Sequence, residues 1–176
     1  AQLGVGKGDK VACISNNRVE WAASAYATYG LGGAFIPMYE AQQEKEWKYI
    51  INDSGAKVAF AATPAIARKL REMQPEMPKL EHVVTYDAPE PEAGSFAALL
   101  KKGAAAPRPA EVPAPDSVAG LIYTSGTTGN PKGVILTHSN FASNVSACIV
   151  TLPIDPEDRT LSFLPWAHSF GQTGEL

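Results

Sequence analysis

The sequence lacks long charged runs and long apolar runs, and each absence narrows the class of protein. Its 176 residues carry a net charge of −3 without an extended basic stretch, which argues against nucleic acid as a partner. No apolar run approaches ~18 residues, so we expect no segment that spans a bilayer, and no signal peptide is visible at the start. The composition, 45% hydrophobic and 19% charged, instead predicts about one globular domain with a sizeable core.

Cysteine is also scarce, and the sequence does not begin with methionine. The two cysteines, Cys13 and Cys148, lie far apart in segments expected to be core, and we interpret both as small buried apolar residues. This usage fits a reducing, cytoplasmic location. The chain opens on alanine in a glycine-containing loop and stops inside what reads as the start of a helix, so we expect a fragment of a longer protein.

Short apolar runs alternate with segments of helical spacing along the chain, and no internal repeat is evident. The repeated strand–helix order predicts an α/β fold, with a mostly parallel sheet flanked by helices on both faces. Residues 103–115, rich in alanine and proline, are predicted to form a surface loop or linker, to which we assign no function. The predicted strands are 10–14, 33–36, 57–60, 82–85, 118–124, 134–136 and 160–164, and the predicted helices run over 17–30, 42–52, 63–75, 96–100 and 137–148.

Several helix boundaries carry recognisable signals. Asn17 and Glu20 have the spacing of a capping box, and Thr63-Pro64 fits a cap followed by proline at the first helical position. Two helices are each expected to bury one face, formed by Trp47, Ile50 and Ile51 in 42–52 and by Ile66, Leu70 and Met73 in the helix that follows Thr63.

Residues 121–137 carry the strongest chemical signal, because two apolar runs flank a loop of glycines and hydroxyls. Glycines let backbone N–H groups approach an anion, since no Cβ blocks the way, while hydroxyls and Lys132 add donors and positive charge. A Walker loop is excluded because Pro131 stands where its second glycine is needed and Gly133 follows the lysine. The sequence therefore predicts a strand–loop–strand site for a polyphosphate.

Residues 123–134, Tyr-Thr-Ser-Gly-Thr-Thr-Gly-Asn-Pro-Lys-Gly-Val, resemble the signature of the adenylate-forming (AMP-binding) enzyme superfamily. This family includes acyl-CoA synthetases, luciferases and the adenylation domains of peptide synthetases. Residues 46–57 are most similar to the long-chain fatty acid branch. Nearly the whole chain resembles the first part of the family's N-terminal domain. We therefore expect residues 1–176 to form part of that N-terminal domain and to include none of the family's C-terminal domain.

The resemblance implies a ligase that converts a fatty acid and Mg-ATP to acyl-AMP and pyrophosphate, and then transfers the acyl group to coenzyme A. Fatty acid, ATP and coenzyme A are thus the implied substrates, with a Mg²⁺ contact at Thr124. The residues implied to bind the nucleotide are Thr124, Ser125, Gly126, Thr127, Thr128, Gly129 and Lys132.

A second stretch, residues 164–171, resembles the family's acyl-pocket motif. Here the resemblance implies that His168 is the catalytic residue near the acyl carboxylate. Some long-chain members carry a gating tryptophan shortly after this histidine, and none of residues 169–176 is tryptophan. His82 and His138 are interpreted as structural or capping residues. The implied substrate-pocket residues are Trp166, His168, Phe170 and Gly171.

Other parts of the family's equipment are not in this sequence, including the Tyr-Gly-x-Thr-Glu segment and the catalytic lysine of the C-terminal domain. We therefore expect the 176 residues alone to be inactive. Two alternatives stay open: an adenylation domain for an amino or aryl acid, and a nucleotide-binding module without catalysis. Peripheral membrane contact of the longer protein is compatible with the resemblance, although no basic amphipathic helix argues for it here.

Overall fold

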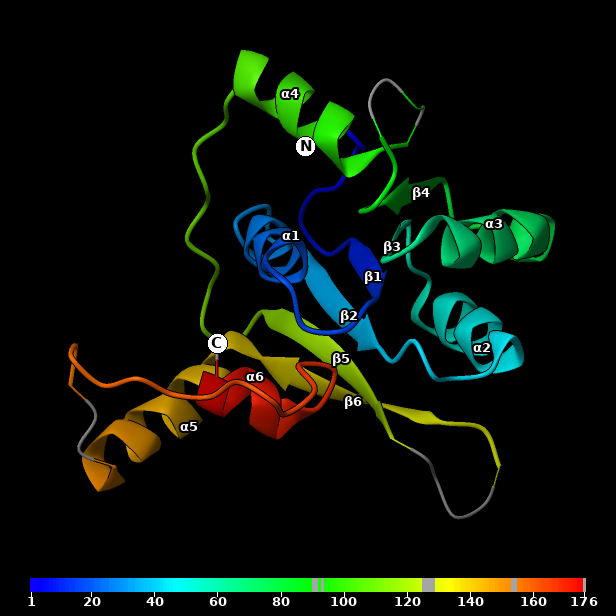
Figure 1. The fold of residues 1–176 in the computed structure, drawn as a ribbon. Coiled ribbons are helices and arrows are strands. Elements are labelled where there is room, and N and C mark those ends of the chain that lie inside the picture. The colour runs from blue at the N-terminus through cyan, green and yellow to red at the C-terminus, as the bar shows by residue number, and fades with distance from the viewer. Residues whose placement is uncertain (90–91, 93, 125–128, 153–154, 176) are drawn as a thin grey trace.

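A six-stranded sheet organises the fold (Figure 1). The structure, a computed structural model, describes residues 1–89, 92, 94–124, 129–152 and 155–175. The strand order is β4-β3-β1-β2-β5-β6; β5 and β6 pair antiparallel, and every other neighbouring pair is parallel. The predicted mostly parallel sheet is confirmed. The strands are β1 (Lys10–Ile14), β2 (Ala34–Met38), β3 (Val58–Ala61), β4 (His82–Thr85), β5 (Val118–Thr124) and β6 (Lys132–Thr137).

The helices begin and end at recognisable caps. Thr63 accepts a hydrogen bond from the backbone of Ile66 with Pro64 in the first turn, as predicted, and Gly55 ends the second helix in the left-handed conformation. Within the described residues, no helix has both the length and the apolarity to cross a membrane. The helices are α1 (Val19–Tyr29), α2 (Glu44–Ser54), α3 (Pro64–Met73), the 3₁₀ turn η1 (Gln74–Glu76), α4 (Phe96–Ala105), α5 (His138–Thr151) and α6 (Ser169–Glu175).

Helices cover both faces of the sheet, as predicted, because successive strand residues point to opposite sides. Ala12 and Ile14 pack with α2 and α3 on one face, whereas Val11 and Cys13 pack with α1 and α4 on the other. The faces predicted for the second and third helices are confirmed, except that Met73 is only partly buried. The helical residues buried on the first face are Trp47, Ile50, Ile51, Ile66, Ala67 and Leu70.

The start of α1 differs from the prediction. Its N-cap is Arg18, which makes no side-chain capping bond, so the proposed capping box of Asn17 and Glu20 is wrong. Asn17 instead contacts the segment before α6, and Glu20 accepts from Arg18. The helix itself is confirmed, and it buries Trp21, Ser24, Ala25 and Thr28.

Three further predictions are corrected. Residues 160–164 form no strand, because the backbone N–H groups of Phe163 and Leu164 donate to the carboxylate of Glu175 rather than to a neighbouring strand. The predicted loop 103–115 begins later, since α4 continues through Ala105. Cys148 is only half-buried, because α5 buries none of its residues.

Candidate functional site

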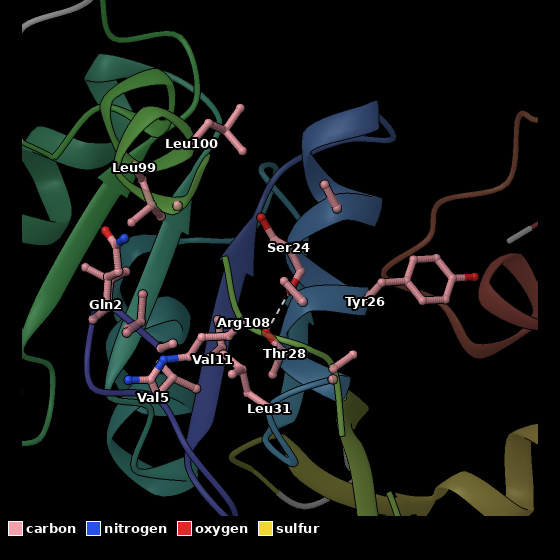
Figure 2. Close-up of a pocket in the computed structure, with 18 of the residues that line it drawn as sticks. Gln2, Val5, Val11, Ser24, Tyr26, Thr28, Leu31, Leu99, Leu100 and Arg108 are labelled. Atoms are coloured by element: carbon pink, nitrogen blue, oxygen red, sulfur yellow. Dashed lines mark hydrogen bonds between the residues drawn. The ribbon is translucent and has the colours of Figure 1, made fainter. Parts of the chain in front are cut away.

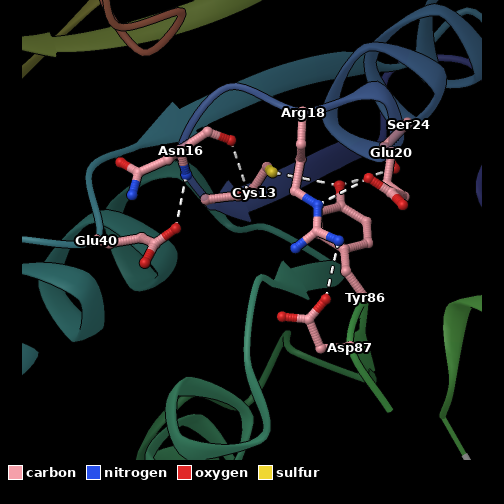
Figure 3. A network of polar contacts seen from close by, with 9 residues as sticks. Cys13, Asn16, Arg18, Glu20, Ser24, Glu40, Tyr86 and Asp87 are labelled. Carbon is pink, nitrogen blue, oxygen red and sulfur yellow. Dashed lines mark hydrogen bonds and ion pairs between the residues drawn. The ribbon is translucent and has the colours of Figure 1, made fainter. Parts of the chain in front are cut away.

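Polar residues gather where the parallel strands end at their carboxyl edge, the side on which open α/β sheets bind ligands. After β1, the backbone N–H of Asn16 donates to Glu40, at 2.7 Å, and Arg18 donates to Asp87, at 2.8 Å, and to Glu20, at 2.7 Å (Figure 3). Glu40 follows β2 and Asp87 follows β4. These bonds join the loops that follow three of the strands.

A buried network lies directly beneath Arg18. The Sγ of Cys13 lies 3.4 Å from the hydroxyl of Tyr86, which donates to Ser24 at 2.9 Å, and the Arg18 guanidinium lies 5.3 Å from the Tyr86 ring centre. Burial raises the pKa of the Cys13 thiol to about 12 and also raises the pKa of Tyr86. Both groups therefore stay protonated, and the network supports the edge rather than supplying a nucleophile.

The hairpin of β5 and β6 carries the glycine-rich loop. Thr124 ends β5 and pairs with Lys132, which begins β6, so the two residues lie opposite each other at the root of the loop. Both residues and Gly129 are exposed. The predicted strands on either side are confirmed, with β6 longer than expected. Of the predicted nucleotide-binding residues, Ser125, Gly126, Thr127 and Thr128 lie outside the described residues.

Tyr123 ties this hairpin to the rest of the fold. Its hydroxyl donates to Asp53 near the end of α2, at 2.6 Å. The Tyr123 ring also covers Gly133 on the neighbouring strand, where an added Cβ would lie 3.0 Å from the ring carbon that bears the hydroxyl. Asp53 could not be predicted from the sequence, because nothing in it relates the end of a helix to a strand 70 residues away.

The four predicted pocket residues divide into two that pack and two that are exposed. Trp166 contacts Trp21 edge to face, with ring centres 5.5 Å apart. Gly171 is buried, and an added Cβ there would lie 2.5 Å from the carbonyl oxygen of Pro165. His168 and Phe170 are exposed, and the backbone N–H of Phe170 donates to Nδ1 of His168 at 3.2 Å. Because Nδ1 accepts, the neutral imidazole carries its proton on Nε2, from which it can donate.

The hairpin and the 164–171 segment both belong to the carboxyl edge. The segment is held by Asn17, which follows β1, and the loop follows β5; β1 and β5 run parallel on either side of β2. No hydrogen bond or ion pair between described residues joins the two groups. Within the described ranges there is also no cluster of three or more His, Cys, Asp or Glu side chains that could hold a metal ion.

A cavity of about 570 Å³ lies elsewhere, between the start of the chain, α1 and α4 (Figure 2). Its lining is largely apolar, with Leu3, Val5, Leu99 and Leu100 among the residues and Arg108 beside them. None of the predicted site residues that the structure describes lines it. The cavity is therefore separate from the site that the sequence predicts.

Known proteins resemble the chain over its whole length. The model of a family described as "AMP-binding enzyme" matches residues 1–176. Fatty acyl-CoA synthetase A of Dictyostelium discoideum is 34% identical over 185 aligned positions that cover 96% of this chain and 27% of that protein. The chain thus spans about a quarter of that relative's length.

Solved structures contain a part with the same fold as this chain. A long-chain-fatty-acid-CoA ligase from Archaeoglobus fulgidus aligns with a TM-score of 0.85 and 26% identity, covering 98% of this chain and 34% of that one. ATP-bound MatB from Rhodopseudomonas palustris aligns with a TM-score of 0.80 and 27% identity, covering 98% of this chain and 33% of that one. These alignments match the described fold to one part of each longer protein.

Proposed function

Because the chain belongs to the AMP-binding enzyme family, we propose that it supplies part of the nucleotide site and acid site of an ATP-dependent fatty acid–CoA ligase. The observation that carries the proposal is the β5–β6 hairpin, which sets Thr124 opposite Lys132 at the root of the glycine-rich loop. The fatty acyl-CoA synthetase named above supports the choice of acid. The scarcity of cysteine supports a cytoplasmic location for the protein.

The proposed reaction has two steps. A carboxylate oxygen of the fatty acid attacks the α-phosphorus of ATP, and pyrophosphate leaves to give acyl-AMP. The thiol of coenzyme A then loses its proton to solvent, its sulfur attacks the acyl carbon, and AMP leaves. Both reactants of the first step are anions, so positioned donors and positive charge must offset their repulsion.

The residues of the hairpin suit that demand. The exposed Lys132 ammonium can approach the β- and γ-phosphates as a mobile positive charge. The hydroxyl of Thr124 is a hard oxygen ligand of the kind Mg²⁺ prefers, with phosphate oxygens and water completing the shell. When bound, Mg²⁺ would neutralise phosphate charge and make pyrophosphate a better leaving group.

His168 and Phe170 suit the acid. Their exposure leaves both side chains open to a substrate. With Nδ1 accepting from the Phe170 backbone, the Nε2–H of His168 can donate to the carboxylate of the acid, and this bond would orient the attacking oxygen. The Phe170 ring offers an apolar surface to the acyl chain.

Pyrophosphate exchange with the intact protein that contains this chain tests the proposal. We expect exchange with fatty acids and not with amino or aryl acids. Lys132→Ala should lower kcat/KM for ATP roughly 10- to 100-fold, as loss of a charged hydrogen bond does. The matched control is Lys102→Ala, an exposed lysine in the last turn of α4. Equal exchange rates in wild-type protein and Lys132→Ala would contradict the assignment of the hairpin to phosphate binding.

A further inference from the structure

Two polar side chains from distant parts of the chain bind residues 162–166. One is Asn17, which follows β1, and the other is Glu175, in the last turn of α6. Neither residue was predicted to belong to the site. The backbone that they hold leads directly into His168.

Asn17 binds the backbone on both sides of Pro165. Its side-chain N–H donates to the carbonyl of Leu164, and its side-chain oxygen accepts from the backbone N–H of Trp166, each at 2.8 Å. An amide can make this pair of bonds only in one orientation, because one of its ends donates and the other accepts. The same amide would have capped α1, which is left without a side-chain cap. Use of a capping residue elsewhere is the kind of local conflict expected near functional sites.

Glu175 collects four donors from the same segment. One carboxylate oxygen accepts from the backbone N–H groups of Phe163, at 3.2 Å, and Leu164, at 3.0 Å. The other accepts from the Ser162 hydroxyl and from the indole N–H of Trp166, at 3.2 Å. Within the part of the chain that the structure describes, no cation pairs with Glu175. Its carboxylate therefore acts as a fixed acceptor that shapes the backbone.

The hydrogen bonds of Asn17 and Glu175 restrict the backbone that precedes His168. The backbone N–H of His168 donates to the carbonyl of Pro165 at 2.9 Å, and Gln172 donates to the carbonyl of Trp166 at 2.8 Å. Gly171 lies so close to Pro165 that no larger side chain fits. The direction of the imidazole thus depends on where Asn17 and Glu175 hold the turn.

We propose that Asn17 and Glu175 are positioning residues, which fix residues 162–166 and thereby aim His168 at the carboxylate of the acid. This inference rests on the ligase function proposed above. It assigns the two residues to the acid side of the reaction and not to ATP binding. Small displacements of a positioned group lower rates sharply, so the effect should appear in the acid kinetics.

The test uses the intact protein with Glu175→Gln and Asn17→Ala. In Glu175→Gln the charge is lost and a donor nitrogen replaces one acceptor oxygen, so the bonds to that oxygen are broken or reversed and those to the other are weakened, at unchanged side-chain size. The matched control is Glu157→Gln at an exposed carboxylate outside the held segment. The hydrogen-exchange rates of the Phe163 and Leu164 amides measure how firmly the segment is held. Steady-state kinetics measure kcat/KM for the acid and KM for ATP separately.

Both variants should exchange faster at these amides than the control, and kcat/KM for the acid should fall roughly tenfold, with KM for ATP within about twofold of wild type. Unchanged exchange and unchanged acid kinetics would overturn the inference, as would equal losses for acid and ATP. A wild-type protein inactive with every acid would overturn the proposed function instead. The exchange result alone would then decide whether Asn17 and Glu175 hold the segment.

Discussion

Gly120 on β5 lies directly against the backbone of Phe35 on β2. A Cβ added to Gly120 would stand 2.7 Å from the Phe35 carbonyl oxygen. These two residues are also the register pair at which the two strands join. The contact therefore connects the four parallel strands β4-β3-β1-β2 to the hairpin that carries the glycine-rich loop.

Gly120→Ala should destabilise the protein by about 1–3 kcal/mol, because a backbone oxygen cannot rotate away from the new methyl group. Gly103→Ala is the control, since a Cβ there would meet nothing within 4 Å. In α4 that change should be neutral or stabilising by up to about 1 kcal/mol. Urea unfolding of both variants measures the difference, and equal midpoints would contradict the close approach of β2 and β5.

Tyr123→Phe should loosen the hairpin while leaving the ring on Gly133. The substitution removes the donor to Asp53, with an expected loss of about 1 kcal/mol in stability and a rise in KM for ATP. Tyr49→Phe is the matched control, a half-buried tyrosine of the same core cluster. If both variants keep the ATP kinetics of wild type, then the contact with α2 does not position the loop.

Much of the sheet could be predicted from the sequence because its signals are local. The runs that form β1, β3 and β4 are short, apolar and bounded by turn residues, and Thr63-Pro64 marks the start of α3 with adjacent residues. The predictions fail where a contact with a residue distant in sequence determines the local structure. Asn17 has the spacing of a cap, but its amide binds residues 147 and 149 positions away. Residues 162–164 read as a strand, but their donors go to Glu175.

The site residues also divide into those with a local sequence signal and those whose role depends on a distant partner. The glycine-rich loop and the histidine segment could be found because each is continuous in sequence. Asp53 and Glu175 could not, since each acts through a contact made only after folding, with Tyr123 in one case and with residues 162–166 in the other. A lone carboxylate at the end of a helix has no pattern that separates such a role from an ordinary solvated position.

The two cysteines should differ in reactivity towards a thiol reagent. Cys13 is fully buried, and its thiol is still protonated at pH 8 because burial raises its pKa to about 12. Cys148 is half-buried on α5. In the native protein we expect Cys148 to react first and Cys13 to react only after unfolding. Mass spectrometry of labelled peptides, with a guanidinium-unfolded sample as control, measures this order; early labelling of Cys13 would contradict its burial.

The hold of Glu175 on residues 162–166 should depend on pH. Hydrogen bonds, first from Ser162 and also from Leu164, Phe163 and Trp166, lower the pKa of Glu175. A carboxylate with a lowered pKa in the folded state contributes its full stability above the unfolded-state value, about 4.3. That stability is lost as the pH falls through the lowered value. The hold should thus be constant near neutral pH and should weaken only in acid.

The indole of Trp166 provides the readout, because its N–H donates to Glu175. With 5-fluorotryptophan in the intact protein, the Trp166 signal should titrate with a midpoint below about 4.3. Trp47, whose indole donates to the backbone carbonyl of Tyr39, is an internal control that should not follow this titration. In Glu175→Gln the Trp166 titration should disappear. A midpoint at or above the ordinary glutamate value would mean that the four donors do not favour the charged carboxylate, and Glu175 would then lose its role in shaping the turn before His168.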